Sequence, residues 1–210
     1  MFDASLSDAD RLARALGAMA ALAELRGRPA DVLPRVLAEL KDACGADGLA
    51  FERREGDELV HVATVGSFAT LVGTRSGVTG SLGGSALLSR NVALAPDTMT
   101  DPRVDRGLCL RSESAALIAV PVDVSGTPAG VLMAGWRTAH GYSDAAVNLL
   151  RIGAGLIAAS VARTLLADRP EDPERLLAGA FSQTSHREAG ERRHGDLDVL
   201  TGARSLAVQQ

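Results

Sequence analysis

The chain has 210 residues, enough for one domain of about 150 residues with flanking segments and a substantial buried core. Its 22 basic and 26 acidic residues give a formal net charge of -4, so it offers no basic field to nucleic acid. Aromatic residues make up only 3% of the chain, whereas hydrophobic residues make up 46%, so aliphatic side chains must fill the interior. These values predict a soluble protein with no nucleic-acid partner.

The cysteines and the N-terminus indicate where the protein works. Cys44 and Cys109 are the two cysteines, and neither shows metal-type spacing, which favours a reducing compartment without a disulfide framework. The first residues (MFDASLSDAD) are acidic and lack the cationic lead of a secretory signal. No uninterrupted apolar run approaches the roughly 20 residues that span a bilayer. We therefore expect a cytoplasmic protein without a membrane partner.

Two helices are predicted at the start of the chain. Over residues 6–25, Leu12, Leu16 and Met19 recur at spacings of four and three, which places them on one helix face. A Gly and a Pro then interrupt the pattern, and residues 31–44 show a second helical stripe.

Short strands and Gly-rich connections follow. Residues 47–54 and 58–65 alternate in part and flank Glu55-Gly56-Asp57, which predicts an antiparallel hairpin. The next segment is rich in glycine and polar residues, where we expect a short helix, a short strand and a polar loop with a helical turn, over residues 80–90, 92–95 and 97–111.

The best-specified stretch lies between residues 115 and 166. Two apolar strands, AALIAVPVDV and AGVLMAGWR, flank a turn with Gly126 and Pro128, which predicts a second hairpin. The long helix that follows should begin at Ser143 as N-cap, with Tyr142 and Val147 forming a hydrophobic staple. After this helix the composition becomes polar and charged.

Several motifs in this order resemble a GAF domain, a small-molecule sensing module of signalling proteins. They are GSLGGSALLS at residues 80–89, Asp101-Pro102-Arg103, Val120-Pro121-Val122, Gly130-Val131-Leu132 and Tyr142-Ser143-Asp144. The resemblance covers roughly residues 28–166. It implies an α+β fold, an α/β sandwich in which an antiparallel sheet of five or six strands is backed by the N- and C-terminal helices.

The resemblance also implies a domain organisation and a role. Residues 1–27 would form a dimer or signalling helix, residues 28–167 the sensory domain, and residues 168–210 a linker, short helix and mobile tail. The expected function is a non-catalytic sensory or regulatory module that binds a small ligand, and not an enzyme. It would form a homodimer through its N-terminal and final helices and pass a signal to an output domain or partner protein.

The ligand site is expected in the loops and strand ends over one sheet face. Glycines there let backbone N–H groups approach a ligand, and a guanidinium fork suits a carboxylate or phosphate, with Arg111 the favoured arginine. The candidate residues are Phe51, Gly80, Gly83, Ser85, Arg103, Cys109, Arg111, Ser114 and Trp136. The sequence leaves the ligand and any cofactor unknown, and no metal site is expected.

Marks of particular GAF subfamilies are mostly missing. Leu110 follows Cys109 where bilin-binding members have Cys-His, and Val92 follows Asn91 where cyclic-nucleotide-binding members have Asn-Lys. We therefore expect neither ligand. Haem ligation through His61, as in gas-sensing members, is an alternative of low weight.

Two other functions stay open. Cys109 falls within about one residue of the nucleophile of the members that reduce free methionine sulfoxide, although Leu82 stands where a second cysteine is expected. A thiol-dependent reductase is therefore one alternative, and Cys44 is a poor resolving partner for it. A GAF-shaped scaffold for protein–protein contacts without a ligand is the other.

A short motif near the C-terminus concerns the output. Asp198-Val199-Leu200-Thr201-Gly202 resembles the opening motif of GGDEF diguanylate cyclase domains, but Ala203 already departs from the pattern. No Gly-Gly-Asp/Glu-Glu-Phe loop follows, so we do not expect this chain to make cyclic di-GMP. A diguanylate cyclase-type output remains a candidate partner.

Overall fold

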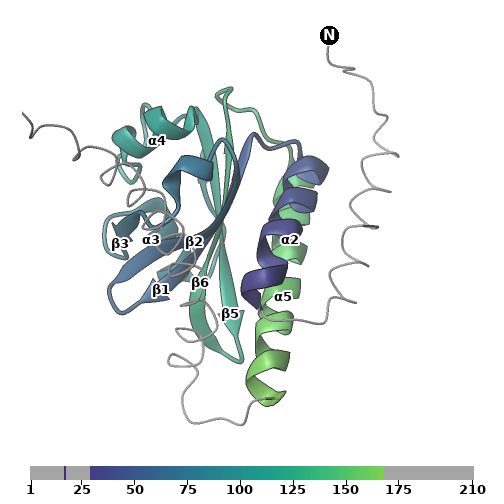
Figure 1. Ribbon diagram of the computed structural model, residues 1–210. Helices are drawn as coiled ribbons and strands as arrows, with labels where there is room; N and C mark the ends of the chain where they lie inside the picture. The colour runs from purple at the N-terminus through teal and green to yellow at the C-terminus, as the bar shows by residue number, and fades with distance from the viewer. Residues whose placement is uncertain (1–16, 18–28, 168–210) are drawn as a thin grey trace, which may run out of the picture.

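Six antiparallel strands form the central sheet of the computed structural model, which describes residue 17 and residues 29–167 (Figure 1). The order across the sheet is β3-β2-β1-β6-β5-β4. This arrangement confirms the predicted α+β fold with an antiparallel sheet. Apart from residue 17, the helix predicted over residues 6–25 lies outside the described residues, as does the tail over 168–210. The strands are β1 Gly48–Glu55, β2 Glu58–Gly66, β3 Arg75–Gly77, β4 Ala93–Ala95, β5 Ala116–Val124 and β6 Thr127–Trp136.

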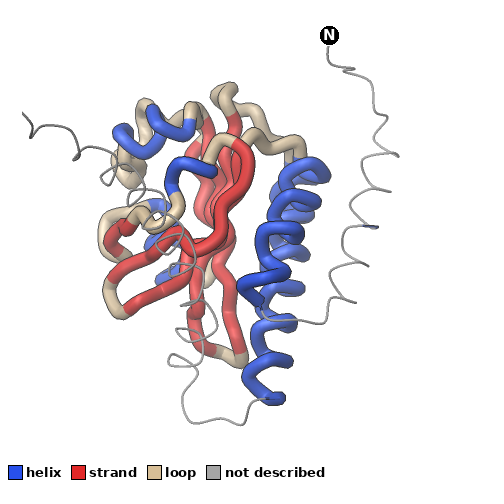
Figure 2. Tube along the Cα trace, viewed as in Figure 1, coloured by secondary structure: helices blue, strands red, loops and turns tan. Residues whose placement is uncertain are grey.

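The two long helices and the short ones cover opposite faces of the sheet. Helices α2 (Pro29–Cys44) and α5 (Asp144–Ala167) pack together against one face (Figure 1). Figure 2 shows the short helices and loops gathered on the other side of the strands. They are η1 Ala69–Leu71, α3 Leu82–Ser89 and α4 Arg106–Ser112.

Alternation along each strand divides the interior into two cores. On β1, Leu49 and Phe51 join the core under α2 and α5, whereas Ala50 joins the core under the short helices. Strands β5 and β6 are buried on both faces, so their sequences read as continuous apolar runs rather than alternating ones. Side chains in one core are therefore separated from those in the other core by the sheet.

The start of α5 is as the sequence predicted. The backbone N–H of Ala146 donates to Ser143 Oγ at 3.2 Å, which is an N-cap hydrogen bond. Tyr142 packs beside Trp136, with ring centroids 5.5 Å apart. Within the described part of the chain, residues Asp144–Ala162 of α5 are long and apolar enough to cross a membrane by length and composition. One face of α5, including Leu150 and Ile157, is buried in the helix core, and 33% of this stretch is buried.

Two elements were not predicted as they occur. The polar segment 97–111, expected as a loop with a helical turn, contains α4, whose N-cap Asp105 accepts a hydrogen bond from Leu108 N at 3.1 Å. Strand β3 was missed because it has three residues, Arg-Ser-Gly, with no apolar alternation. Its place in the sheet comes from pairing with β2, which is a tertiary contact.

Candidate functional site

A cavity lies between the sheet and the short helices, on the face opposite α2 and α5. Its empty volume is about 500 Å³, counted out to its open mouth. Most of its wall is apolar, and a few polar side chains converge on it, which is the usual composition of a small-molecule site. The lining residues are Glu52, His61, Phe68, Leu71, Ser76, Ser81, Leu82, Gly83, Arg103, Val104, Asp105, Leu108, Cys109, Ser112, Leu117 and Met133.

The Gly-rich segment forms one wall because its backbone packs closely. Ser81 caps α3, accepting from Gly84 N at 3.0 Å and donating to the carbonyl of Gly77 at 2.6 Å. A Cβ on Gly84 would lie 1.6 Å from the carbonyl oxygen of Val78, so only glycine fits there. Leu82 N donates to the carbonyl of Arg103 at 2.9 Å, which joins this wall to the next loop.

A buried acid and imidazole face each other on the floor of the cavity. Glu52 and His61 are direct cross-strand partners on β1 and β2. Their Oε1 and Nε2 atoms are 3.1 Å apart, and their side chains are 3% and 4% exposed. His61 Nδ1 lies 3.2 Å from the carbonyl oxygen of Thr74. Since a carbonyl can only accept, Nδ1 carries the proton in the neutral ring, and the Nε2 lone pair faces Glu52.

Burial determines the protonation of this pair. Desolvation raises the pKa of Glu52 to about 8. The pKa of His61 is lowered, mainly by burial, with Arg111 acting in the same direction and the Thr74 hydrogen bond against it. At neutral pH the pair is therefore a carboxylic acid donating from Oε1 to a neutral imidazole. Glu52 Oε2 is buried and has no hydrogen-bond partner among the described residues.

The arginine on the cavity wall is held by its own loop. Arg103 Nε and Nη2 lie 2.9 and 2.6 Å from the two carboxylate oxygens of Asp101, a bidentate pair. Nη2 also donates to the carbonyl of Leu94 at 2.9 Å. The positive charge of Arg103 is thus offset by Asp101 within the protein.

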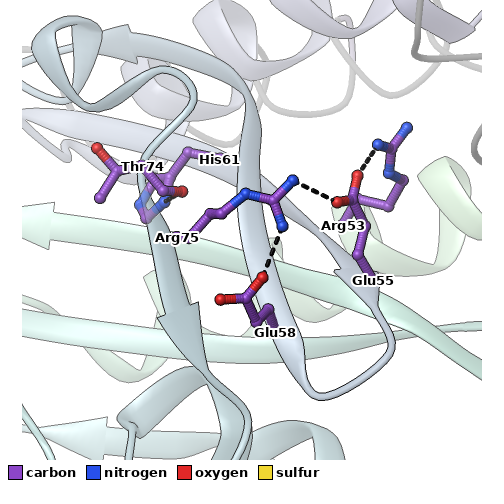
Figure 3. A network of polar contacts seen from close by, with 6 residues as sticks. All are labelled: Arg53, Glu55, Glu58, His61, Thr74 and Arg75. Carbon is purple, nitrogen blue, oxygen red and sulfur yellow. Dashed lines mark hydrogen bonds and ion pairs between the residues drawn. The ribbon is translucent and has the colours of Figure 1, made fainter.

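A second polar network fixes the edge strand beside the cavity. Figure 3 shows Arg75 of β3 between Glu58 and Glu55, to each of which it donates at 2.7 Å, while Arg53 also donates to Glu55. These ion pairs are partly exposed and individually weak. Together they hold β3 against the β1–β2 hairpin, and β3 supplies Ser76 to the cavity.

Both thiols have a raised pKa and lie on opposite sides of the sheet. Burial, and then the charge of Asp105, raises the pKa of Cys109 to about 11, so its thiol stays protonated. Burial likewise raises the pKa of Cys44 to about 11. Cys44 donates to the carbonyl of Lys41 at 3.6 Å and packs on the helix core, across the sheet from Cys109. The sheet therefore separates the two thiols.

Comparison with known families identifies the fold. The family model for the GAF domain matches residues 28–161. The chain belongs to the GAF domain family. A search of curated proteins finds no match to this sequence. GAF domains are generally regulatory sensors and typically soluble, although some structural neighbours are enzymes.

Solved structures agree on the GAF fold at low sequence identity. The GAF domain of a phosphoenolpyruvate-protein phosphotransferase from Coxiella burnetii superposes with a TM-score of 0.68 at 17% identity, covering 78% of this chain and 99% of that one. Free methionine-R-sulfoxide reductase from Neisseria meningitidis, in complex with its substrate, gives 0.65 at 22% identity, covering 78% and 96%. The chromophore-binding domain of a bacteriophytochrome from R. palustris gives 0.64 at 13% identity, covering 80% and 65%.

Three of the nine candidate residues meet at the cavity of this GAF domain. Gly83, Arg103 and Cys109 line it from α3, the following loop and α4. Ser85 lies on α3 without lining the cavity. Ser114 is buried behind the wall, with its Oγ 2.9 Å from that of the lining residue Ser112.

The other four candidates lie away from the cavity. Phe51 and Trp136 are in the helix core, on the opposite face of the sheet. Gly80, with φ +82°, forms the turn before α3. Arg111 is exposed on α4 and is not part of the lining, so the arginine favoured for an anionic ligand does not reach into the cavity.

Glu52 is the functional candidate that sequence reasoning missed, and His61 was considered only as a haem ligand. A signal for the pair was available. Strands that end at Glu55 and resume at Glu58 place residue 52 directly opposite residue 61. Both ring nitrogens of His61 already face partners, Thr74 and Glu52, which leaves no free lone pair for haem iron. Among the described residues no group of three or more His, Cys, Asp or Glu could hold a metal ion.

Proposed function

We propose that this GAF domain is a non-catalytic sensory or regulatory module that binds a small ligand in the cavity between the sheet, α3 and α4. The observation that carries the proposal is an open, mostly apolar cavity with a buried carboxyl oxygen that has no partner in the described part of the chain. A regulatory role fits the two thiols as well, because each has a pKa near 11 and neither is a nucleophile at neutral pH.

The proposed signal leaves through the helices on the opposite face. Helices α2 and α5 pack together and on the sheet whose other face forms the cavity floor. A ligand that favours one sheet geometry would shift the balance of helix arrangements. The protein would act in the cytoplasm as a homodimer through residues 1–27 and α5, with an output domain or partner protein, a diguanylate cyclase-type domain among the candidates.

Native mass spectrometry of the purified full chain, with its absorption spectrum, tests the ligand. We expect a bound small molecule in the wild type and its loss in Leu108→Trp, because Leu108 lines the cavity and a larger ring would fill it. Leu110→Trp is the matched control, since Leu110 lies on the same helix and is 77% exposed. A wild-type chain with no added mass, or an adduct that survives Leu108→Trp, would contradict the proposal and favour a protein-interaction module.

A thiol-dependent methionine sulfoxide reductase is a second candidate because Cys109 lines the cavity. The raised pKa of Cys109 and the position of Cys44 across the sheet weigh against it. Turnover of free methionine-R-sulfoxide by the wild type and by Cys109→Ala decides the matter. Activity in the wild type that is lost in the variant would replace the sensory proposal, whereas background activity in both would remove the reductase.

A further inference from the structure

The unpaired oxygen of Glu52 indicates what kind of group the cavity receives. Glu52 is 2% exposed, and its Oε2 has no hydrogen-bond partner among residues 29–167. It lies 2.8 Å from the position that a Cβ on Gly83 would take, on the cavity wall. Buried polar atoms are nearly always hydrogen-bonded, so an orphan oxygen at a cavity marks a place for an external partner.

That partner must be a hydrogen-bond donor. His61 is oriented by Thr74 so that its Nε2 faces Glu52 Oε1, and the proton shared by the pair lies between these two atoms. Whether this proton is on the acid or on the ring, Oε2 keeps its lone pairs and carries no hydrogen. A carboxylate or phosphate would place oxygen against oxygen there.

The charges around the cavity favour a cation. The lining contains two acids, Glu52 and Asp105, and one arginine, Arg103, whose charge is offset by Asp101. Asp105 uses Oδ1 to cap α4. The rest of the wall is largely aliphatic and aromatic, including Phe68, Leu117 and Met133, which suits an apolar body.

From this geometry we infer that the cavity takes a small organic ammonium compound with an apolar body, whose nitrogen donates to Glu52 Oε2. The inference rests on the proposed function, since it names the ligand class for the same cavity. Neither the arginine on the wall nor the exposed Arg111 supplies a free cation inside it, so the expectation of an anionic ligand is replaced.

The bound cation would be linked to protons. It favours the ionised carboxylate, so binding releases a proton from the pair and tightens as pH rises toward about 8. Asp105, the N-cap of α4, and Cys109 of α4 line the cavity together with the pair, and the Arg103–Asp101 pair adjoins them from the preceding loop. Arg111 is exposed on α4, but its charge still acts on His61.

A matched panel tests the inference on the full chain. Calorimetric titrations use n-pentylamine, pentan-1-ol and pentanoate near neutral pH, where the amine is cationic and the acid anionic. We expect the amine to bind the wild type most tightly and to lose roughly 10- to 100-fold in affinity in Glu52→Gln. Glu39→Gln is the control, because Glu39 is exposed on α2, on the opposite face of the sheet from the cavity. It should leave every affinity unchanged.

A carboxyl ¹³C NMR titration of Glu52 in the wild type gives a second readout that needs no variant to fold. Pentylammonium should lower the pKa of Glu52, and pentan-1-ol should not. Tighter binding of pentanoate, amine binding that Glu52→Gln leaves intact, or an unmoved pKa would each overturn the inference. Pentanoate binding in the cavity would refute the ligand class but leave the proposed function standing. If none of the three compounds bound and the native mass spectrum showed no adduct, both the inference and the proposed function would be refuted.

Discussion

The Glu52–His61 pair makes the stability of this domain depend on pH in a way that one substitution should abolish. The pKa of Glu52 is about 8 in the folded chain against 4.5 for the ordinary side chain. Between these values the folded state holds a proton that the unfolded state has released. The stabilisation is thus fully present below pH 4.5 and is lost as pH rises through about 8.

The pH range in which Glu52 alone determines the pH dependence of stability begins above the ordinary pKa of histidine, 6.5. Below it, the lowered pKa of His61 makes stability rise with pH and opposes the effect of Glu52. Above it, His61 is neutral in both states, and both thiols titrate only beyond their ordinary value of 9.0. One proton per molecule then gives a slope of about -1.4 kcal/mol per pH unit near pH 6.5, which halves by pH 8, so the loss between pH 6.5 and 8 is about 1.6 kcal/mol.

Glu52→Gln should flatten this profile. The amide N–H of glutamine can donate to His61 Nε2 as the protonated acid does, and its carbonyl can replace Oε2. We expect a free energy of unfolding within about 1 kcal/mol of wild type at pH 6.5 and nearly constant up to pH 8. Urea unfolding of the wild type and of Glu52→Gln between pH 6.5 and 8 measures these free energies. A flat wild-type profile, or equal slopes in both chains, would show that Glu52 is ionised in the native state and refute the reasoning.

Three further predictions concern two glycines, the N-cap of α5 and the thiol of Cys109. Gly84→Ala should destabilise the fold by about 3 kcal/mol or more in urea unfolding, because a Cβ there meets the carbonyl of Val78, whereas Gly155→Ala, in open space on α5, should stabilise by roughly 0.5–1 kcal/mol. Equal effects would mean that α3 does not pack as described. Ser143→Ala should cost about 1 kcal/mol by removing the cap of α5, and an unchanged denaturation midpoint would show that the cap does not contribute. Cys109 should react with a thiol reagent at neutral pH at least about 100-fold more slowly in the folded chain than in urea, and fast labelling of the native chain would mean that its pKa is not raised.

The elements that the sequence predicted well are those whose signals are local. Both hairpins have turn residues between apolar strands, and α5 begins at a capping serine, so propensity and structure agree. Strand β3 and helix α4 depend on neighbours: β3 exists through pairing with β2, and α4 packs against η1. Their sequences alone are polar and short.

The candidate site was predictable only in part, because the face of a strand is set by register. Gly83, Arg103 and Cys109 were found from loop chemistry, and they do line the cavity. Phe51 was chosen on β1 although its neighbour Glu52 faces the cavity. Regular alternation on β1 puts Phe51 in the helix core and Glu52 at the cavity. The register change lies on β2, where Val62 is an extra residue between the partners of Phe51 and Glu52, and a bulge of this kind is not visible in the local sequence.

The position of Phe51 and Glu52 also brings the cavity and the helix core onto neighbouring residues of one strand. Glu52 forms part of the cavity floor, and Phe51, fully buried, stands in the core beneath α2 and α5. A single peptide bond joins the two compartments. A displacement of Glu52 by a ligand would therefore also displace the backbone of Phe51. Replacing Phe51 by a smaller residue should weaken the coupling between the cavity and helices α2 and α5, and it would leave every cavity-lining side chain unchanged.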